Sequence, residues 1–358
     1  MLVPAWDGQL PAAELERLAA AGERARTDYV ALASALDADV MDWDFFQRQA
    51  TGAARAAARR SGLVPAQILE AYVRRNQYAH VVAKADRLGL PLALLHKMTR
   101  ARRDLVLISV WLSRPKKAVF LKPLGVHSHL KAIISYGSVQ NEIAEKRLGL
   151  PGHKLHHALQ PVDERFWRPE DHPMEDLICA VGSEARDYGT LVDAVRGLDV
   201  RTEIAVGGIV LRTGNLDVDL RPALRPLAAP DLPPNVTVRR QLDNQELRRM
   251  YARSRIVVVP TEDVDFDAGV TAIAEAMAMG KAVVVTRSRG QRDLIVEGET
   301  GLYVPPGDPR ALRTAIEHLL EHPAEAERMG SAARAVVEER LTLDGWVQQV
   351  LAVTSAPA

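Results

Sequence analysis

Two carboxylates in the segment DFDAGVTAIAEAMAMGKAVVVT (residues 265–286) have a spacing that suits ligand binding. Asp267 precedes apolar residues at the i, i+3, i+4 and i+7 positions of one buried helical face, and Glu275 lies among them. Eight residues of helix rise about 12 Å, so the two carboxylates would meet a ligand at separated points. Each carboxylate can accept hydrogen bonds from paired hydroxyl groups. The alternative is that Asp267 caps the helix and Glu275 is solvated.

The start of this predicted helix is a candidate phosphate site. A strand predicted at residues 255–260 and a loop come before it, which puts the amino end of the helix at the carboxyl edge of a parallel sheet. There the backbone N–H groups of Gly269, Val270 and Thr271 and the helix dipole would favour an anion. A nucleoside diphosphate sugar across the helix mouth would place its sugar near one carboxylate and its ribose near the other.

The second half of the chain alternates between predicted strands and helices. This alternation indicates parallel strands in a doubly wound α/β sheet, whose ligands bind beyond the carboxyl ends of the strands. The strands are predicted at residues 176–182, 201–208, 236–241, 255–260 and 282–286, and the helices at residues 188–198 and 244–254.

The first half is interpreted as a second α/β domain. Its helices are predicted at residues 11–26 and 65–89, and its strands at residues 38–43, 104–111 and 131–135.

The length of 358 residues suits two domains. We place them at residues 1–168 and 169–342, with residues 165–176 as the linker. The amphipathic tail, from about residue 343 to residue 358, is expected to pack back on the first domain.

Charge is unevenly distributed between the two halves. Residues 1–168 carry 25 Lys/Arg and 16 Asp/Glu, and the remainder carries 21 and 30, which leaves net charges of about +9 and −9. Between Arg48 and Lys131 there are 17 basic and 3 acidic residues. A solvated basic face is one explanation, and an anionic partner is the other. A phosphate-bearing acceptor or lipid surface suits better than a nucleic acid, because no nucleic-acid-binding motif accompanies the charge.

The sequence also indicates a cellular compartment. No run of 18 apolar residues is present, and the start MLVPAWDGQL lacks the layout of a signal peptide. We therefore expect a cytoplasmic protein, with peripheral contact at the inner membrane face if the anionic partner is a lipid. The single cysteine, Cys179, lies in an apolar run and is expected to be a buried strand residue rather than a nucleophile.

Four ordered motifs in the second half resemble the donor domain of GT-B, family-4-type retaining glycosyltransferases (glycosyl transferases group 1). They are Asp267-x7-Glu275, EAMAMGKAVVVT (275–286), VEGETGLYVPPGDPRAL (296–312) and RMGSAARAVVEERL (328–341). The resemblance implies the GT-B fold, in which two Rossmann-like α/β domains face a central cleft. It also implies a nucleotide-diphosphate sugar as donor substrate, no cofactor, no metal ion and retention at the anomeric carbon.

The resemblance gives roles to three residues with charged side chains. By position in the motif, Glu275 binds the ribose hydroxyls and Asp267 contacts the donor sugar, although Asp267 is one methylene shorter than the usual glutamate. Arg186 matches the basic residue on the donor diphosphate, where its planar charged group would stabilise the leaving diphosphate. A surface arginine paired with Glu184 or Asp187 is the alternative for Arg186.

Other donor contacts follow from the same resemblance. Ser183 stands where the family often has arginine, so one phosphate cation is replaced there. The remaining matches are Arg240, Gln241 and Leu242 near the nucleobase and Gly290 near the sugar and phosphates.

The first domain offers fewer signals. His127 is the candidate for a catalytic contact from this domain, and Trp111, Ser113 and Lys116 are expected on the acceptor side because they follow a predicted strand. An exposed basic loop is the alternative for these three. The histidines at 153, 156 and 157 lack further ligands nearby, so no metal site is predicted.

The sequence thus predicts a retaining, metal-independent transfer of a sugar from a nucleotide-diphosphate donor to an acceptor hydroxyl or similar group. Two alternatives stay open. One is another GT-B enzyme, such as a nucleotide-sugar epimerase, and the other is a non-catalytic nucleotide-sugar-binding partner or scaffold. A nicotinamide dehydrogenase is disfavoured, because no G-x-G-x-x-G follows any predicted strand.

Overall fold

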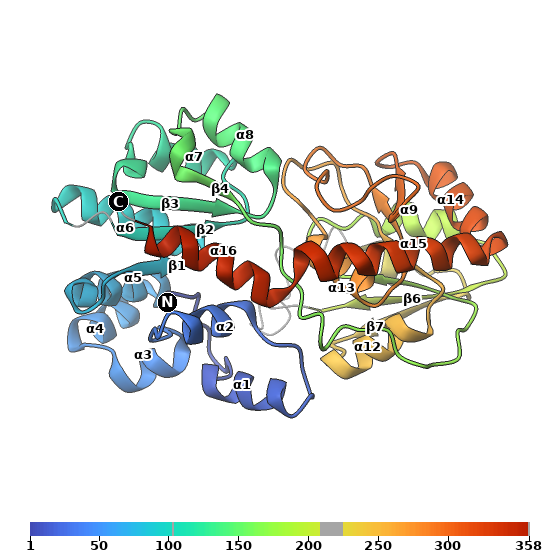
Figure 1. Cartoon of the computed structure of the whole chain (residues 1–358), viewed down its shortest axis with the longest axis horizontal. Coiled ribbons are helices and arrows are strands. Elements are labelled where there is room, and N and C mark those ends of the chain that lie inside the picture. Colours follow the sequence, from blue (N-terminus) through green and yellow to red (C-terminus); the bar gives the residue numbers. More distant parts are fainter. Residues whose placement is uncertain (102–103, 208–224, 357–358) are drawn as a thin grey trace. The chain divides into compact units, whose positions relative to one another are not determined.

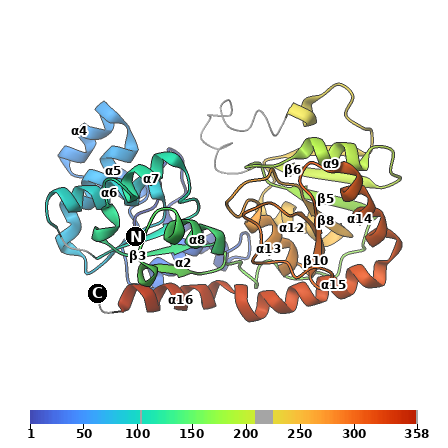
Figure 2. The same cartoon turned by 90° about the horizontal axis from the view of Figure 1, so that it is seen from above.

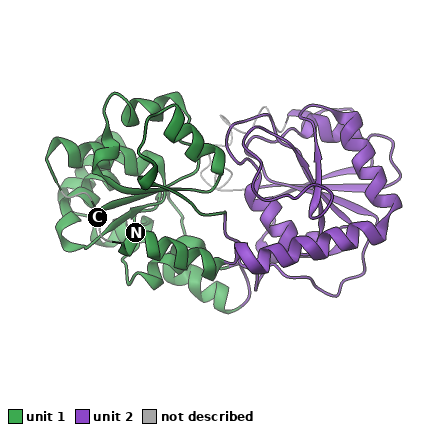
Figure 3. Cartoon of the chain, turned by 45° about the horizontal axis from the view of Figure 1, so that its top comes forward, with its two compact units in different colours: residues 1–21, 26–159, 343–358 green, residues 22–25, 160–342 purple. Residues whose placement is uncertain are grey.

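A computed structural model describes residues 1–101, 104–207 and 225–356. The chain forms two compact units (Figure 3). Unit 1 consists of residues 1–21, 26–159 and 343–358, and unit 2 of residues 22–25 and 160–342. Each unit has its own parallel sheet, which confirms the predicted α/β class. Arg102 and Arg103 of the basic stretch, and Gly208 at the end of one predicted strand, lie outside the described residues.

Unit 1 contains a four-stranded parallel sheet in the order β1-β2-β3-β4. Side chains alternate between its faces: Leu105 and Leu107 pack with helices α5 and α6, whereas Val106 and Ile108 pack with α2 and α16. Figure 1 shows α16 running beside this sheet. The strands are β1 (Val81–Ala83), β2 (Leu105–Ser109), β3 (Leu130–Ser135) and β4 (Leu155–His157).

The helices of unit 1 cover both faces of its sheet. They are α1 (Ala12–Ala20), α2 (Asp28–Ala35), α3 (Trp43–Gln49), α4 (Gly52–Ser61), α5 (Leu63–Arg74), α6 (Asp86–Met98), α7 (Pro115–Leu121), α8 (Ser138–Lys146) and α16 (Leu343–Ser355), with short 3₁₀ turns η1 (Arg75–Gln77), η2 (Val126–His129) and η3 (Gly152–Lys154).

Unit 2 contains a six-stranded parallel sheet in the order β10-β9-β8-β5-β6-β7. Numbered within the unit, this is the doubly wound order 6-5-4-1-2-3, which reverses direction between β5 and β8. The strands are β5 (Leu177–Val181), β6 (Arg201–Val206), β7 (Val236–Arg240), β8 (Ile256–Val259), β9 (Ala282–Thr286) and β10 (Gly301–Val304).

Helices also cover both faces of the unit 2 sheet. Helices α9 and α14 contribute to one buried core, and they lie side by side in Figure 2. The helices of this unit are α9 (Tyr188–Val195), α12 (Asn244–Arg253), α13 (Val270–Ala278), α14 (Pro309–Glu321) and α15 (Pro323–Val336), with the 3₁₀ turn η4 (Arg225–Ala228) and the π-helical segment η5 (Val337–Leu341).

The sequence predictions differ in quality between the two units. The five strands predicted in unit 2 are all present, and only the edge strand β10 was not predicted. In unit 1 the helix predicted at 65–89 is wrong, because β1 interrupts it. The strand predicted at 38–43 is also wrong: Met41 forms only an isolated bridge with Leu2, and α3 begins at Trp43.

Candidate functional site

The strand-order reversal of unit 2 marks its candidate site. In doubly wound sheets, ligands bind outside the carboxyl ends of the strands at such a reversal. The segments that follow β5 and β8 meet there: Arg186 and Thr261 form an isolated antiparallel bridge, and Asp187 N donates to Pro260 O at 3.1 Å.

A pocket of about 270 Å³ opens at this edge. Four of the predicted donor residues line it, namely Arg186, Leu242, Thr271 and Glu275. The other walls are mostly small or apolar residues of β5, β6 and α12, including Gly182, Gly207 and Leu247. The fold therefore brings together predicted donor residues that are up to 89 positions apart, from 186 to 275.

Arg186 is buried in this wall, with 5% of its surface exposed. Its Nε donates to Val181 O at 2.9 Å, and its Nη1 donates to Glu184 O at 2.8 Å. Gly182 has a φ of +112°, and a Cβ there would lie 2.2 Å from Arg186 Nη2, so only glycine leaves room for the guanidinium. Among the described residues Arg186 forms no ion pair, and burial lowers its pKa. The guanidinium keeps N–H capacity for an anion.

Glu275 lies on α13 and faces the same pocket. Its Oε2 accepts a hydrogen bond from the Tyr251 hydroxyl at 3.0 Å. Burial raises the pKa of Glu275 to about 7, against the opposing effects of Tyr251 and Arg186. Tyr251 was not predicted, because in the sequence it is one more apolar-face residue of an amphipathic helix and belongs to no motif.

Asp267 lies on the loop between β8 and α13, with 5% of its surface exposed. Both of its carboxylate oxygens are buried without a hydrogen-bond partner in the described part of the chain. It does not cap α13, whose N-cap is Gly269 and which has no side-chain cap. Burial raises the pKa of Asp267 to about 7. Buried polar atoms normally have partners, so this carboxylate keeps an unmet capacity to accept hydrogen bonds.

The Asp267 loop is held by the loop that follows β9. Arg289 N donates to Asp263 Oδ1 at 2.9 Å, Gly290 N to Val264 O at 2.8 Å, and Gln291 Nε2 to Ala268 O at 3.2 Å. At Gly290 a Cβ would lie 2.1 Å from Phe266 O, so the two loops touch through their backbones. Gly290 was predicted as a contact for the sugar and phosphates, and the structure places it against the Asp267 loop. Gln291 was not predicted.

The other predicted donor residues lie around the same edge. Ser183 Oγ donates to Gly207 O at 2.6 Å, across the ends of β5 and β6. Gln241 has a φ of +55°, and its N–H donates to Val206 O at 3.2 Å. Arg240 is the exposed last residue of β7. The N–H of Val270, predicted to be available to phosphate, donates to Asp267 O at 3.2 Å.

The predicted residues of the first domain fall on two edges of the unit 1 sheet. Trp111, Ser113 and Lys116 follow β2, at the carboxyl edge. His127 lies in η2 directly before β3, at the amino edge, and its Nδ1 is 3.2 Å from Leu121 O. The structure therefore does not bring His127 together with the three predicted acceptor-side residues.

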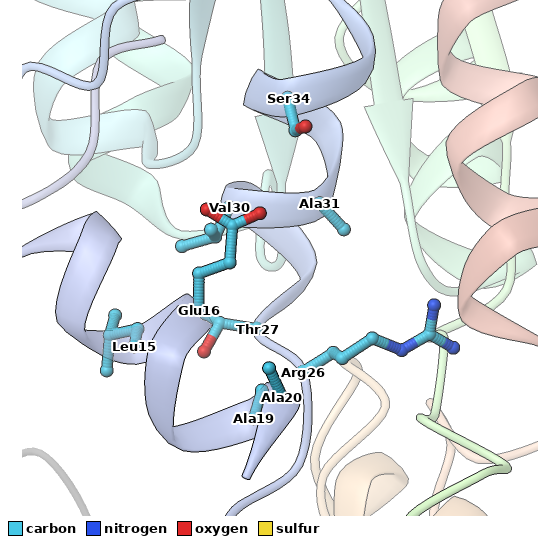
Figure 4. A pocket seen from close by; sticks show the side chains of 9 residues that line it. All are labelled: Leu15, Glu16, Ala19, Ala20, Arg26, Thr27, Val30, Ala31 and Ser34. Carbon is cyan, nitrogen blue, oxygen red and sulfur yellow. The ribbon is translucent and has the colours of Figure 1, made fainter.

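Cys179 is buried in β5, which confirms its prediction, and burial raises its pKa to about 12. Across the residues that the structure describes, no group of three or more metal-ligating side chains is present and no helix is long and apolar enough to cross a membrane. A pocket of about 340 Å³ between α1 and α2 contains Glu16 and Arg26 (Figure 4), but none of the predicted site residues.

Comparison with known proteins identifies the domain that carries the pocket. The family model described as "Glycosyl transferases group 1" matches residues 178–322. Those residues form a glycosyl transferases group 1 domain. The D-rhamnosyltransferase WbpZ of Pseudomonas aeruginosa is 27% identical to this chain over 186 residues, which are 51% of this chain and 46% of WbpZ. The chain spans about half the length of WbpZ and of the amylovoran biosynthesis glycosyltransferase AmsK of Erwinia amylovora, at 46% and 49%.

Solved structures extend the likeness of the glycosyl transferases group 1 domain to the fold of the whole chain. Anabaena Alr3699/HepE in complex with UDP and glucose superposes with a TM-score of 0.68 and 15% identity, covering 99% of both chains. A glycosyltransferase from Rickettsia africae ESF-5 gives a TM-score of 0.63 and 14% identity, covering 99% of this chain and 96% of that one. The predicted GT-B fold is thereby confirmed.

Proposed function

We propose that this protein is a retaining, metal-independent glycosyltransferase that uses a nucleotide-diphosphate sugar. One observation carries the proposal: at the strand-order reversal one pocket is lined by a carboxylate, Glu275, and by a buried cation, Arg186, which forms no ion pair with the described residues. The adjoining loop carries Asp267, a buried carboxylate that has no hydrogen-bond partner among the same residues. Two relatives support the same reaction class, because WbpZ is a D-rhamnosyltransferase and AmsK is a glycosyltransferase of amylovoran biosynthesis.

The strand order suggests how the donor would lie along the carboxyl edge. The base would sit near Gly207 at the end of β6 and Leu242 just after β7, and the diphosphate near Arg186 beyond the end of β5. Glu275 would accept hydrogen bonds from the ribose hydroxyls, and Asp267, beyond β8, from the donor sugar.

The chemistry follows from this placement. As the bond between the sugar and the diphosphate breaks, negative charge grows on the leaving phosphate, and Arg186 stabilises that charge. The acceptor would attack from the same face, with the leaving phosphate taking its proton. We propose a cytoplasmic enzyme whose acceptor is anionic or lies at an anionic membrane surface, in keeping with the basic first half of the chain.

The test is a thermal-shift screen with UDP, GDP, ADP, dTDP and their sugar conjugates, beginning with UDP-glucose. A ligand at 100 times its Kd adds about 2.7 kcal/mol to the free energy of unfolding, which raises the midpoint visibly. We expect one base class to stabilise the protein and Glu275→Gln and Arg186→Lys to abolish the effect. Stabilisation by no nucleotide at all would overturn the proposal.

Two further assays separate a glycosyltransferase from the two alternatives, an epimerase and a non-catalytic scaffold. A nucleotide-sugar epimerase converts the donor without an acceptor, which product analysis of the donor alone detects. A non-catalytic scaffold binds the donor but releases no nucleoside diphosphate with any acceptor.

A further inference from the structure

The loop that follows β2 in unit 1 is held by side chains that follow the two neighbouring strands, β1 and β3. Asp86, just after β1, accepts a hydrogen bond from Ser109 Oγ at 2.5 Å and one from Lys117 Nζ at 2.7 Å. Lys117 Nζ also donates to Trp111 O at 2.6 Å. From the other side, Gln140 Oε1, after β3, accepts a hydrogen bond from Ser113 N at 3.1 Å. The loop of residues 110–114 and the first turn of α7 are therefore held in place at the carboxyl edge of this sheet.

This fixed loop presents two cations outward. The guanidinium carbon of Arg114 lies 4.1 Å from the centroid of the Trp111 ring, and both Arg114 and Lys116 are exposed. Neither forms an ion pair within the described residues, whereas Lys117 is turned inward to Asp86. From residue 105 to residue 141 the sequence contains no Asp or Glu, so no acidic side chain of that stretch offsets these charges.

The arrangement suits an anion with several oxygens. A guanidinium stacked on an indole loses few rotamers on binding, and its in-plane N–H groups remain available to paired oxygens of a phosphate. The loop is held before any ligand arrives, so ordering it adds little to the cost of binding.

We propose that Arg114, supported by Trp111 and Lys116, binds a phosphate group of the acceptor. The inference rests on the proposed function only in calling this ligand the acceptor, because the binding itself needs no nucleotide. The phosphate could belong to a soluble sugar phosphate or to a lipid headgroup, and the experiment separates the two.

The first experiment follows the five tryptophan indole N–H signals by ¹H–¹⁵N NMR during titration with glucose 6-phosphate and with glucose. The Trp111 signal is assigned with Trp111→Phe. We expect glucose 6-phosphate, and not glucose, to shift this signal. Arg114→Ala should weaken binding about tenfold to a hundredfold, as for the loss of a charge-assisted hydrogen-bond pair, and Lys116→Ala should weaken it less.

The matched control is Arg59→Ala, which removes another exposed arginine, from α4. It should leave the titration unchanged. Equal loss in Arg59→Ala and Arg114→Ala would show unspecific attraction to a basic surface and overturn the proposal. Glu275→Gln should remove nucleotide binding and leave the Trp111 titration intact, so a failure of the proposed donor site is distinguishable from a failure here.

The second experiment measures flotation with vesicles of phosphatidylglycerol or of phosphatidylcholine. If the protein floats with the anionic vesicles, if Arg114→Ala abolishes this flotation and if glucose 6-phosphate gives no response, the phosphate belongs to a lipid headgroup. A response to glucose 6-phosphate without flotation assigns it to a soluble acceptor. If neither probe responds in an Arg114-dependent manner, the loop is not a phosphate site.

Discussion

Each unit buries a carboxylate beyond a strand at the carboxyl edge of its sheet, and the two carboxylates differ in their partners. Asp86 in unit 1 is 7% exposed, and both of its oxygens accept hydrogen bonds. Asp267 in unit 2 is 5% exposed, and neither of its oxygens has a partner within the described residues. Burial is nearly equal, so burial alone does not mark a ligand site. Unmet hydrogen-bonding capacity distinguishes Asp267, which we propose as a ligand contact, from Asp86, which holds a loop.

We expect the largest change in stability from breaking the ion pair between Lys117 and Asp86. Lys117→Ala leaves Asp86 with Ser109 as its remaining side-chain donor, and removing one partner of a buried ion pair typically costs 3–5 kcal/mol. Because the Lys117 side chain is 23% exposed, water can replace part of the interaction, so we expect a loss of about 3 kcal/mol in the free energy of unfolding. Urea denaturation of the variant measures it.

The neighbouring residue provides the control for this experiment. Lys116→Ala removes the same charge from an exposed position and should stay within about 0.5 kcal/mol of the wild type. If Lys117→Ala and Lys116→Ala lower the free energy of unfolding equally, the ion pair between Lys117 and Asp86 does not stabilise the fold.

The second prediction concerns Asp267, and here we expect the substitution to increase stability. Asp267→Asn removes a charge that is buried at high pH, so it should stabilise the protein at pH 8. Raising the pKa of Asp267 from 3.8 to about 7 corresponds to roughly 4 kcal/mol. The amide of Asn would itself lack partners, so we expect a gain of about 2 kcal/mol.

The pH dependence of that gain makes the test specific. Between about pH 4 and pH 7 the native state binds the Asp267 proton more tightly than the unfolded state, so this group lowers stability as pH rises through that window. The stability of Asp267→Asn relative to the wild type should therefore be lowest near pH 4, where only the cost of the unpartnered amide remains, rise up to pH 7 and stay constant above it. Thermal midpoints of both proteins at pH 4, 6 and 8 show whether it does. A pH-independent difference would contradict a raised pKa.

The third prediction is that donor binding strengthens with pH. Hydroxyl groups of the donor donate hydrogen bonds, which favours the ionised forms of Asp267 and Glu275, both with a pKa of about 7. Affinity for the sugar nucleotide that the screen identifies should rise about tenfold between pH 6 and pH 8 and then level off, which is about 1.4 kcal/mol. Calorimetric titrations at several pH values measure this change, and Asp267→Asn should show a smaller one.

The sequence predicted unit 2 far better than unit 1, for a physical reason. The strands of unit 2 are continuous apolar runs such as RIVVVP, bounded by helices of clear periodicity, so both the sheet and the segment of Asp267 and Glu275 could be recognised. In unit 1, β1 is three residues long and lies between helices α5 and α6, so the periodic pattern continued across it.

Side-chain partnership lay beyond what the sequence could predict. Nothing in the spacing distinguishes Lys116 from Lys117, yet Lys117 turns inward to Asp86 and Lys116 stays exposed. In the same way, Tyr251 contacts Glu275, and Gln291 contacts the Asp267 loop. Only the fold brings these segments together. The sequence motif named four residues that line one pocket, whereas the side chains that hold their neighbours in place could not be named in advance.

The smallest effect is expected from removing one such unpredicted contact. In Tyr251→Phe, Glu275 loses the hydroxyl that favours its charged form, so its pKa should rise further above about 7. Sugar-nucleotide affinity at pH 7 should fall several-fold, about 1 kcal/mol, and recover at pH 9, where Glu275 ionises without the hydroxyl. Tyr303→Phe is the matched control, because the Tyr303 hydroxyl has no partner among the described residues. A loss of affinity that persists at pH 9 would mean that the Tyr251 hydroxyl shapes the pocket rather than the charge of Glu275.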